Sequence, residues 1–239
     1  MTLLDRYLAG EHEPVWADIR AAAPDVDDVV VEQVAHETAR RARIQIEEIV
    51  AGFREAGLNP AFDFPLLVTP PTDVRERITE VESLTGRLPA ILRASVIEIG
   101  NVCLTGDSKA LGLFYNEYRP VSSSPPSADY PDPLCLPGIE VIEFESEAAI
   151  EMAQLDESGP PYELVIAPDE YHKANISGGA QVLSVDAAFP DPVIEGIHGR
   201  RGITYLQYLR VAVAWGGLPG YEFGEAPAAL AGLRRTPNF

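Results

Sequence analysis

Hydrophobic positions repeat most regularly between residues 27 and 56. Apolar or small side chains recur there every three or four residues, which is the spacing of one face of an α-helix. The stripe consists of Val31, Val34, Thr38, Ala42, Ile46, Ile49 and Phe53. Gly57 follows the stripe and predicts the end of the helix. Two shorter stripes within residues 2–22 predict two short helices before it, so we interpret residues 1–60 as an N-terminal helical extension.

The next predicted elements are an extended segment, two helices and a short strand. Residues 61–71 are broken by prolines, and residues 72–85 have the pattern of a helix with Thr72 as its N-cap. Pro89 suits the first turn of the following helix, because its missing N–H is not needed there. Gly100 tolerates the positive φ at which helices commonly end, and a short β-prone run follows it.

The second half of the chain alternates between strand and helix patterns. Short β-prone runs and turn residues predict strands at 139–145, 162–167, 174–176 and 181–185, with a hairpin turn at 177–180. Helices are predicted at 147–155 and 203–214. Strands joined by tight turns favour antiparallel pairing, so we expect an α+β fold in which N-terminal helices precede a mainly antiparallel sheet flanked by helices. The expected domains are the extension, 1–60, and the α+β domain, 61–239.

The net charge limits the classes of partner. The chain has 239 residues and a formal net charge of −19, so its field repels other polyanions. We therefore do not expect nucleic acid or anionic membranes as partners. A basic protein is the expected partner. The apolar runs are too short to span a bilayer, and the N-terminus lacks the pattern of a signal peptide. We therefore expect a cytoplasmic protein.

Candidate catalytic groups gather around His172, within residues 167–179. His172 could act as a base and Asp169 could orient its ring, which would make the chain a hydrolase. The neighbouring Ser177 lacks the G-x-S-x-G setting of a nucleophile. A turn and strand without chemistry, or a binding edge, are the alternative interpretations of this stretch.

Motifs for metals, redox chemistry and phosphate binding are missing from the sequence. The four histidines are scattered, and none forms a pair with metal-ligand spacing. Cys103 lies in an apolar run and is interpreted as a small core residue, whereas Cys135 lies in a proline-rich loop. Neither cysteine has a C-x-x-C partner, and the two do not make a disulfide framework. We expect no metal and no cofactor.

Acidic residues are dense between positions 140 and 163. A solvated face explains such a run, and an acidic docking surface for a basic protein is the functional alternative. An aromatic cluster at 107–118 and a Pro- and Ser-rich loop at 120–133 lie just before it. The residues expected to contact a partner are Glu140, Glu143, Glu145, Glu147, Tyr115, Tyr118 and Tyr130.

A family resemblance lies in residues 78–106. The positions that match are Ile78, Glu82, Gly86, Leu88, Pro89, Leu92, Arg93, Gly100 and Asn101. They follow the order of an acidic residue in a first helix, a glycine, a Leu-Pro pair, a second helix with a basic residue, and a turn into a strand. In these positions the chain resembles the SUKH superfamily, immunity-type domains related to the yeast Smi and Knr proteins. The resemblance implies an α+β domain that binds another protein, in bacteria mostly a toxin and often a nuclease.

These features predict a non-enzymatic protein-binding domain of the immunity or antitoxin type, with a basic toxin or another basic protein as its partner. Two alternatives stay open. The N-terminal helices, residues 2–56, could pack against a second copy or a larger assembly, which would make the chain a structural or regulatory subunit. A hydrolase centred on His172 is the other.

Overall fold

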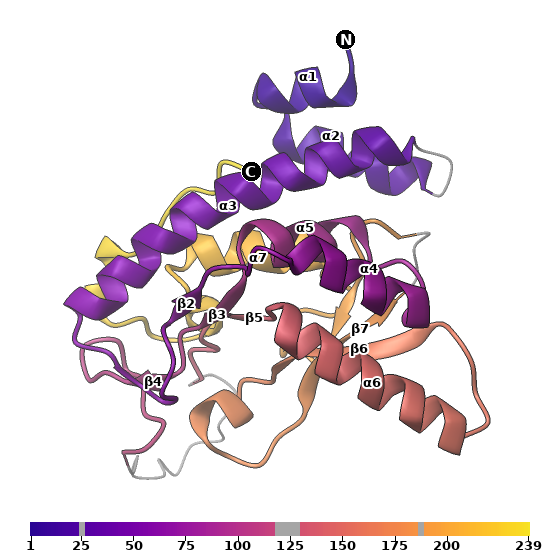
Figure 1. Cartoon of the computed structure of the whole chain (residues 1–239). Helices are drawn as coiled ribbons and strands as arrows, with labels where there is room; N and C mark the ends of the chain where they lie inside the picture. The colour runs from indigo at the N-terminus through magenta and orange to yellow at the C-terminus, as the bar shows by residue number, and fades with distance from the viewer. Residues whose placement is uncertain (24–26, 118–129, 186–188) are drawn as a thin grey trace.

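The first quarter of the chain is helical, and the remainder combines helices with short strands (Figure 1). The computed structural model describes residues 1–23, 27–117, 130–185 and 189–239. Within these ranges the helices are α1 (Leu3–Leu8), α2 (His12–Ala22), α3 (Asp28–Glu55), α4 (Val74–Thr85), α5 (Ala90–Glu98), α6 (Ile139–Leu155) and α7 (Tyr205–Ala214). Short 3-10 helices lie at His172–Ala174, Pro219–Phe223 and Ala228–Gly232. The strands are β1 (Asn59–Pro60), β2 (Leu67–Val68), β3 (Asn101–Cys103), β4 (Gly106–Asp107), β5 (Cys135–Leu136), β6 (Tyr162–Pro168), β7 (Ala180–Val185) and β8 (Ile194–Glu195).

All strand pairs in the described ranges are antiparallel. They form three small sheets, with the orders β1-β4, β2-β3-β5 and β6-β7-β8. β3 is the centre of the second sheet, where Val102 lies opposite Leu67 on one side and Leu136 on the other. Helices flank these sheets, so the predicted α+β class is confirmed, although several small sheets stand where one was expected.

α3 lies across α5 and α7, and it is the long helix that the hydrophobic stripe predicted (Figure 1). All seven residues of the stripe are buried. The side chain of Asp27 accepts a hydrogen bond from Val29 N and caps the first turn. Trp16 of α2 is fully buried against α3, where its Nε1 donates to Thr38 Oγ1 over 2.9 Å. The stripe therefore packs against neighbours on both sides, the short N-terminal helices and the body of the fold.

The helices around Gly86 and Gly100 follow the expected order. α4 ends at Gly86, whose φ is 87°, and α5 begins directly after Pro89. The predicted N-cap Thr72 is wrong, because the chain makes a turn from Pro71 to Val74 and Asp73 takes that position without a side-chain bond. Gly100 has φ 88°, and a Cβ there would meet the carbonyl oxygen of Val68. A glycine is required at this point because β2 and the end of α5 approach closely.

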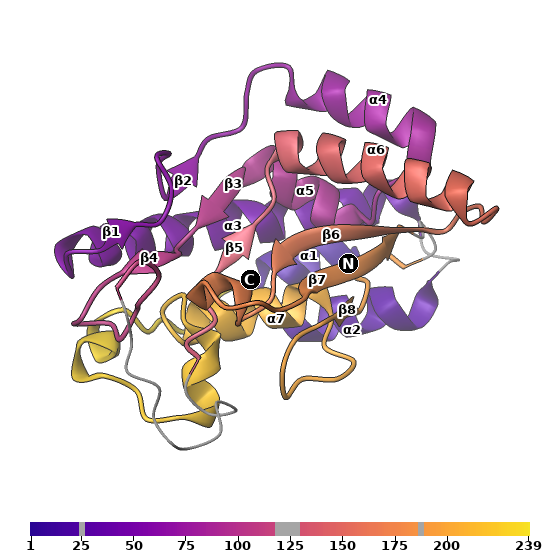
Figure 2. The same cartoon turned by 90° about the horizontal axis from the view of Figure 1, so that it is seen from below.

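The strand predicted at 139–145 is wrong. This segment is the first half of α6, which lies beside α4 (Figure 2). Its alternation of apolar and acidic residues fits a strand, but Ile139, Ile142 and Ser146 also share one face of a helix, and all three are buried. Short apolar runs do not distinguish strand from helix by periodicity alone. Packing of α6 against β6 and α4 decides in favour of the helix.

The strand predicted at 174–176 is also wrong. The chain forms a 3-10 turn at His172–Ala174, and Asn175 has φ 58°. The carboxylate of Asp169 accepts hydrogen bonds from the backbone nitrogens of His172, over 2.9 Å, and of Gly179. Backbone groups that a strand would pair with a neighbour are therefore bound within the loop, and the connection between β6 and β7 spans 169–179 rather than 177–180.

The C-terminal residues pack against the N-terminal helices. Phe239 is buried, and its carbonyl oxygen accepts a hydrogen bond from Arg210 Nε over 2.7 Å. Gln45 of α3 donates to the carbonyl oxygen of Thr236 over 2.9 Å. One continuous cluster of buried side chains includes residues from both sides of position 60. The division into an N-terminal extension, 1–60, and an α+β domain, 61–239, stays a prediction, and substitution of Trp16 tests it.

Candidate functional site

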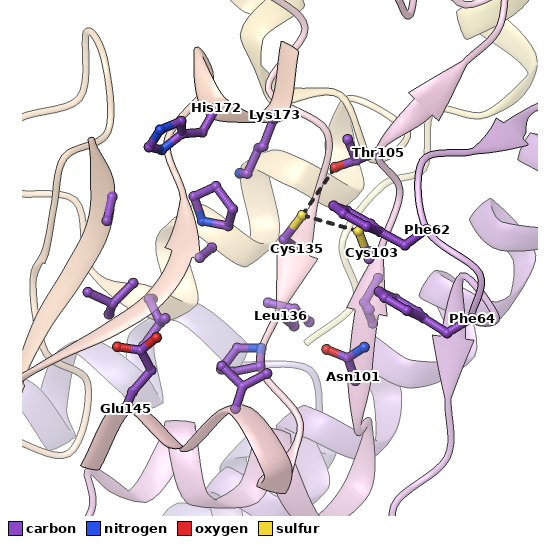
Figure 3. A pocket seen from close by; sticks show the side chains of 18 of the residues that line it. Phe62, Phe64, Asn101, Cys103, Thr105, Cys135, Leu136, Glu145, His172 and Lys173 are labelled. Carbon is purple, nitrogen blue, oxygen red and sulfur yellow. Dashed lines mark hydrogen bonds between the residues drawn. The ribbon is translucent and has the colours of Figure 1, made fainter. Parts of the chain in front are cut away.

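A cavity of about 550 Å³ lies between the β2-β3-β5 sheet, the β6-β7 hairpin and the first half of α6 (Figure 3). Aliphatic side chains form much of its wall, among them Val141 of α6 and Val165 of β6. Elements distant in the sequence meet here, because β5 joins β3 on one side and faces β6 on the other. The volume lies within the roughly 300–1,000 Å³ that is typical of small-molecule sites.

Aromatic rings form one side of the cavity. Phe62 and Phe64 stack with their centroids 5.5 Å apart and their planes 1° from parallel. Tyr115 lies tilted against Phe62 at 5.6 Å. The buried carboxylate of Asp107 fixes this tyrosine by accepting a hydrogen bond from its backbone nitrogen over 2.6 Å. Both phenylalanines keep a large exposed surface, so their faces are available to a ligand.

His172 lies at one end of the cavity (Figure 3). Its Nδ1 is 2.7 Å from the carbonyl oxygen of Gly179, which only accepts hydrogen bonds, so Nδ1 is the donor. In the neutral ring Nε2 is then an acceptor. Asp169 binds the backbone of this loop rather than the ring, so the predicted orientation of His172 by Asp169 is wrong. The cavity next to His172 nevertheless meets one requirement of the enzyme hypothesis.

Lys173 belongs to a buried polar network beside His172. Its Nζ donates to Asp132 Oδ1 over 2.6 Å, and the hydroxyl of Tyr208 donates to Asp132 Oδ2 over 2.9 Å. Gln181 Nε2 is 3.4 Å from the same carboxylate. Burial is the largest single influence and lowers the pKa of Lys173, but Asp132, Tyr208 and Cys135 together outweigh it and hold that pKa above its usual value. Lys173 is therefore a fixed positive charge and not a general base.

The two cysteines lie opposite each other in the wall of the cavity, in the strands β3 and β5 (Figure 3). Their sulfur atoms are 3.9 Å apart, and Thr105 Oγ1 is 3.6 Å from Cys135 Sγ. The hydrogen bond from the Cys135 thiol lowers the pKa of Cys103. The same hydrogen bond, together with burial, raises the pKa of Cys135. Sequence spacing missed this pair, because strand pairing joins residues 32 positions apart.

The residues predicted to contact a partner do not form one surface. Glu145 and Tyr115 line the cavity, and burial raises the pKa of Glu145. Glu140 and Glu143 both bind Arg77 of α4, at 3.0 and 2.5 Å. These two ion pairs therefore join α4 to α6.

The remaining members of the predicted set lie elsewhere. Glu147 is exposed on α6. The ring of Tyr130 lies 5.0 Å from that of Tyr171. Tyr118 lies outside the described residues. The described members of the set thus divide between the cavity, the α4–α6 contact, the outer face of α6 and the contact of Tyr130 with Tyr171.

Comparison of the chain with protein-family models, with curated proteins and with solved structures finds no match. The described residues contain no group of three or more His, Cys, Asp or Glu side chains placed to hold a metal ion. In the same ranges, no helix combines the length and hydropathy that crossing a bilayer requires.

Proposed function

We propose that this protein binds an organic small molecule in the cavity between the β2-β3-β5 sheet and the β6-β7 hairpin. The observation that supports the proposal is the combination of an apolar cavity of about 550 Å³ with a small number of convergent polar groups. Apolar walls supply affinity through burial, and a few fixed polar groups orient the ligand.

The lining suggests the class of ligand. A flat aromatic or other apolar body fits against Phe62 and Phe64, whose stacked rings flank the cavity. Lys173 and His172 lie at one end and Glu145 lies at the other (Figure 3). A hydrogen-bond donor on the ligand suits Nε2 of His172 at one end, and a second donor suits Glu145 at the other.

Filling the cavity is expected to weaken ligand binding. The probe is anilinonaphthalene sulfonate, an aromatic anion whose fluorescence rises in apolar surroundings. Val165→Phe adds a ring inside the cavity, so we expect its affinity for the dye to fall by about tenfold, which corresponds to about 1.4 kcal/mol. The measurement is a fluorescence titration, with circular dichroism to verify the fold.

Val29→Phe is the matched control. Val29 is exposed at the start of α3, so the substitution adds the same ring outside the cavity. Its dye affinity should equal that of the unmodified chain. Equal affinity in all three proteins would contradict binding in this cavity.

A second candidate function is the docking of a basic protein on the outer face of α6, as the resemblance to immunity-type domains implies. Phe144, Met152 and Leu155 are 68%, 56% and 77% exposed. Phe144 and Leu155 share one helical face with Glu147 and Glu151, since these four positions are separated by three or four residues or by whole turns, and Met152 borders that face. An apolar stripe between carboxylates suits an amphipathic basic partner, and a net charge of −19 would steer it.

Substitution of this face is expected to abolish capture of a basic partner. The tagged chain should retain a basic protein at low salt and release it at high salt, because screening weakens surface electrostatics. Phe144→Ser with Met152→Ser should lose that protein. Glu140→Gln with Glu143→Gln should still retain it, because those carboxylates bind Arg77. Equal capture by all three proteins would contradict docking on α6.

A further inference from the structure

We propose that Cys103 and Cys135 form a reactive dithiol centre that reduces low-molecular-mass disulfides entering the cavity. Cys103 is the attacking thiol, and Cys135 resolves the mixed disulfide. The inference goes beyond ligand binding and does not require it, because the two sulfurs lie in the cavity wall whether or not another ligand is present.

The strand register places the two cysteines where a disulfide can close without backbone movement. Cys103 and Cys135 are direct partners in the antiparallel pair of β3 and β5. Cys103 N donates to Leu66 O on the opposite side of β3, and Leu104 N donates to Leu134 O. The cysteines therefore occupy a non-hydrogen-bonded pair, in which Cα atoms are about 4.5 Å apart. That separation lies within the roughly 4.4–6.8 Å that disulfides span.

The sulfur atoms are close but not bonded. Their separation of 3.9 Å must fall to about 2.05 Å in a disulfide, which a rotation of the side chains can provide. Both cysteines are partly exposed and line the cavity, so a small disulfide that enters the cavity can reach Cys103.

The surroundings assign the two roles. The Cys135 thiol donates to the sulfur of Cys103, and this hydrogen bond lowers the pKa of Cys103. The positive charge of Lys173 acts in the same direction. The thiolate is the nucleophile in thiol–disulfide exchange, so Cys103 attacks first. Cys135 keeps its proton and follows as the resolving group.

The exchange balances in two steps. The Cys103 thiolate forms a bond to one sulfur of the substrate R–S–S–R, whose S–S bond breaks and releases one thiolate. Cys135 then gives up its proton and attacks the Cys103 sulfur of the mixed disulfide, which releases the second thiolate. The protein loses two electrons and two protons, and the substrate gains them as two thiols. The product is a disulfide that connects β3 to β5.

The test treats the full chain with hydroxyethyl disulfide, a small neutral disulfide, and follows intact mass and free thiols. The unmodified protein should lose both free thiols without retaining an adduct. Cys135→Ser should accumulate a single adduct on Cys103, because the resolving thiol is missing. Cys103→Ser should react at least about tenfold more slowly, because burial still raises the pKa of Cys135 after the hydrogen bond with Cys103 is lost. Circular dichroism verifies that both variants are folded.

Two outcomes would overturn the proposal. The first is an unmodified protein that keeps both thiols or accumulates adducts, which would show that the pair does not close. The second is an equal rate of adduct formation in Cys103→Ser and Cys135→Ser, which would show that the roles are not distinct. Neither outcome bears on dye binding by the cavity, so the binding proposal is tested separately.

The pH profile provides a readout that a merely structural pair would not give. A lowered pKa keeps the Cys103 thiolate present at pH values below those of an ordinary cysteine. Alkylation by iodoacetamide should therefore persist as the pH falls, and Cys135→Ala should shift the profile to higher pH. The charged and titratable groups that line the same cavity are Glu145, Tyr115, His172 and Lys173, and both proteins retain them. Superimposable pH profiles of the unmodified protein and Cys135→Ala would contradict the assignment of Cys103 as the attacking thiol and Cys135 as the resolving thiol.

Discussion

Asp132→Asn is expected to lower the free energy of unfolding by about 3 kcal/mol, because it leaves the buried Lys173 ammonium without its counter-ion. The carboxylate of Asp132 also accepts hydrogen bonds from Tyr208 and Gln181, so the substitution weakens the whole network. The measurement is urea unfolding followed by far-ultraviolet circular dichroism. Asparagine keeps the shape of the side chain and tolerates the positive φ of 48° at this position.

Two further variants identify the cause of that loss. Asp132→Asn combined with Lys173→Met removes both charges, and it should recover more than half of the lost stability, since a buried pair is replaceable when neither charge remains. Glu47→Gln is the matched control, because it breaks the exposed pair of Glu47 with Arg43 and should cost less than about 1 kcal/mol. A loss for Asp132→Asn as small as that of the control would show that the network does not stabilise the fold.

Trp16→Ala is expected to lower the free energy of unfolding by about 3–5 kcal/mol, the usual range for removing a fully buried large side chain. The loss should extend beyond the N-terminal helices, because α3 packs directly on α5 and α7. Trp215 is the remaining tryptophan in this variant, and it lies at the end of α7. Its fluorescence therefore reports on the surroundings of α7, within residues 61–239, and its urea midpoint should shift with the N-terminal substitution.

The control for this experiment is Leu8→Ala, which removes an exposed side chain of α1 and should leave the midpoint unchanged. An unchanged Trp215 midpoint in Trp16→Ala would instead show that residues 1–60 fold as an independent extension. The experiment thus decides the domain boundary that the sequence predicts at residue 60.

The sequence predicted helices best where their packing signal is local. The stripe of α3 and the pattern of α7 both gave helices close to their observed bounds. Pro89 and Gly100 marked the limits of α5 because backbone geometry acts on single residues. The segment 139–145 failed because its apolar and acidic residues satisfy a period of two and a helical face equally well.

The candidate site was less predictable than the elements. Tyr115, Glu145 and His172 were named from the sequence, and the structure brings these three to one cavity. The sequence assigned Tyr115 and Glu145 to a docking surface and His172 to a catalytic turn, because the three residues are far apart along the chain. The cysteine pair was not predicted, since C-x-x-C spacing detects only neighbours within one turn.

The sequence by itself determined the α+β class, the long helix α3 and the acidic character of the chain. These properties depend on spacings of a few residues or on summed charge, which sequence contains directly. Only the tertiary structure decided that β5 pairs with β3, that Lys173 pairs with Asp132, and that 139–145 is helical. Each of these outcomes depends on which distant segment packs alongside, because burial and strand pairing act between residues that are close in space and far apart in the chain.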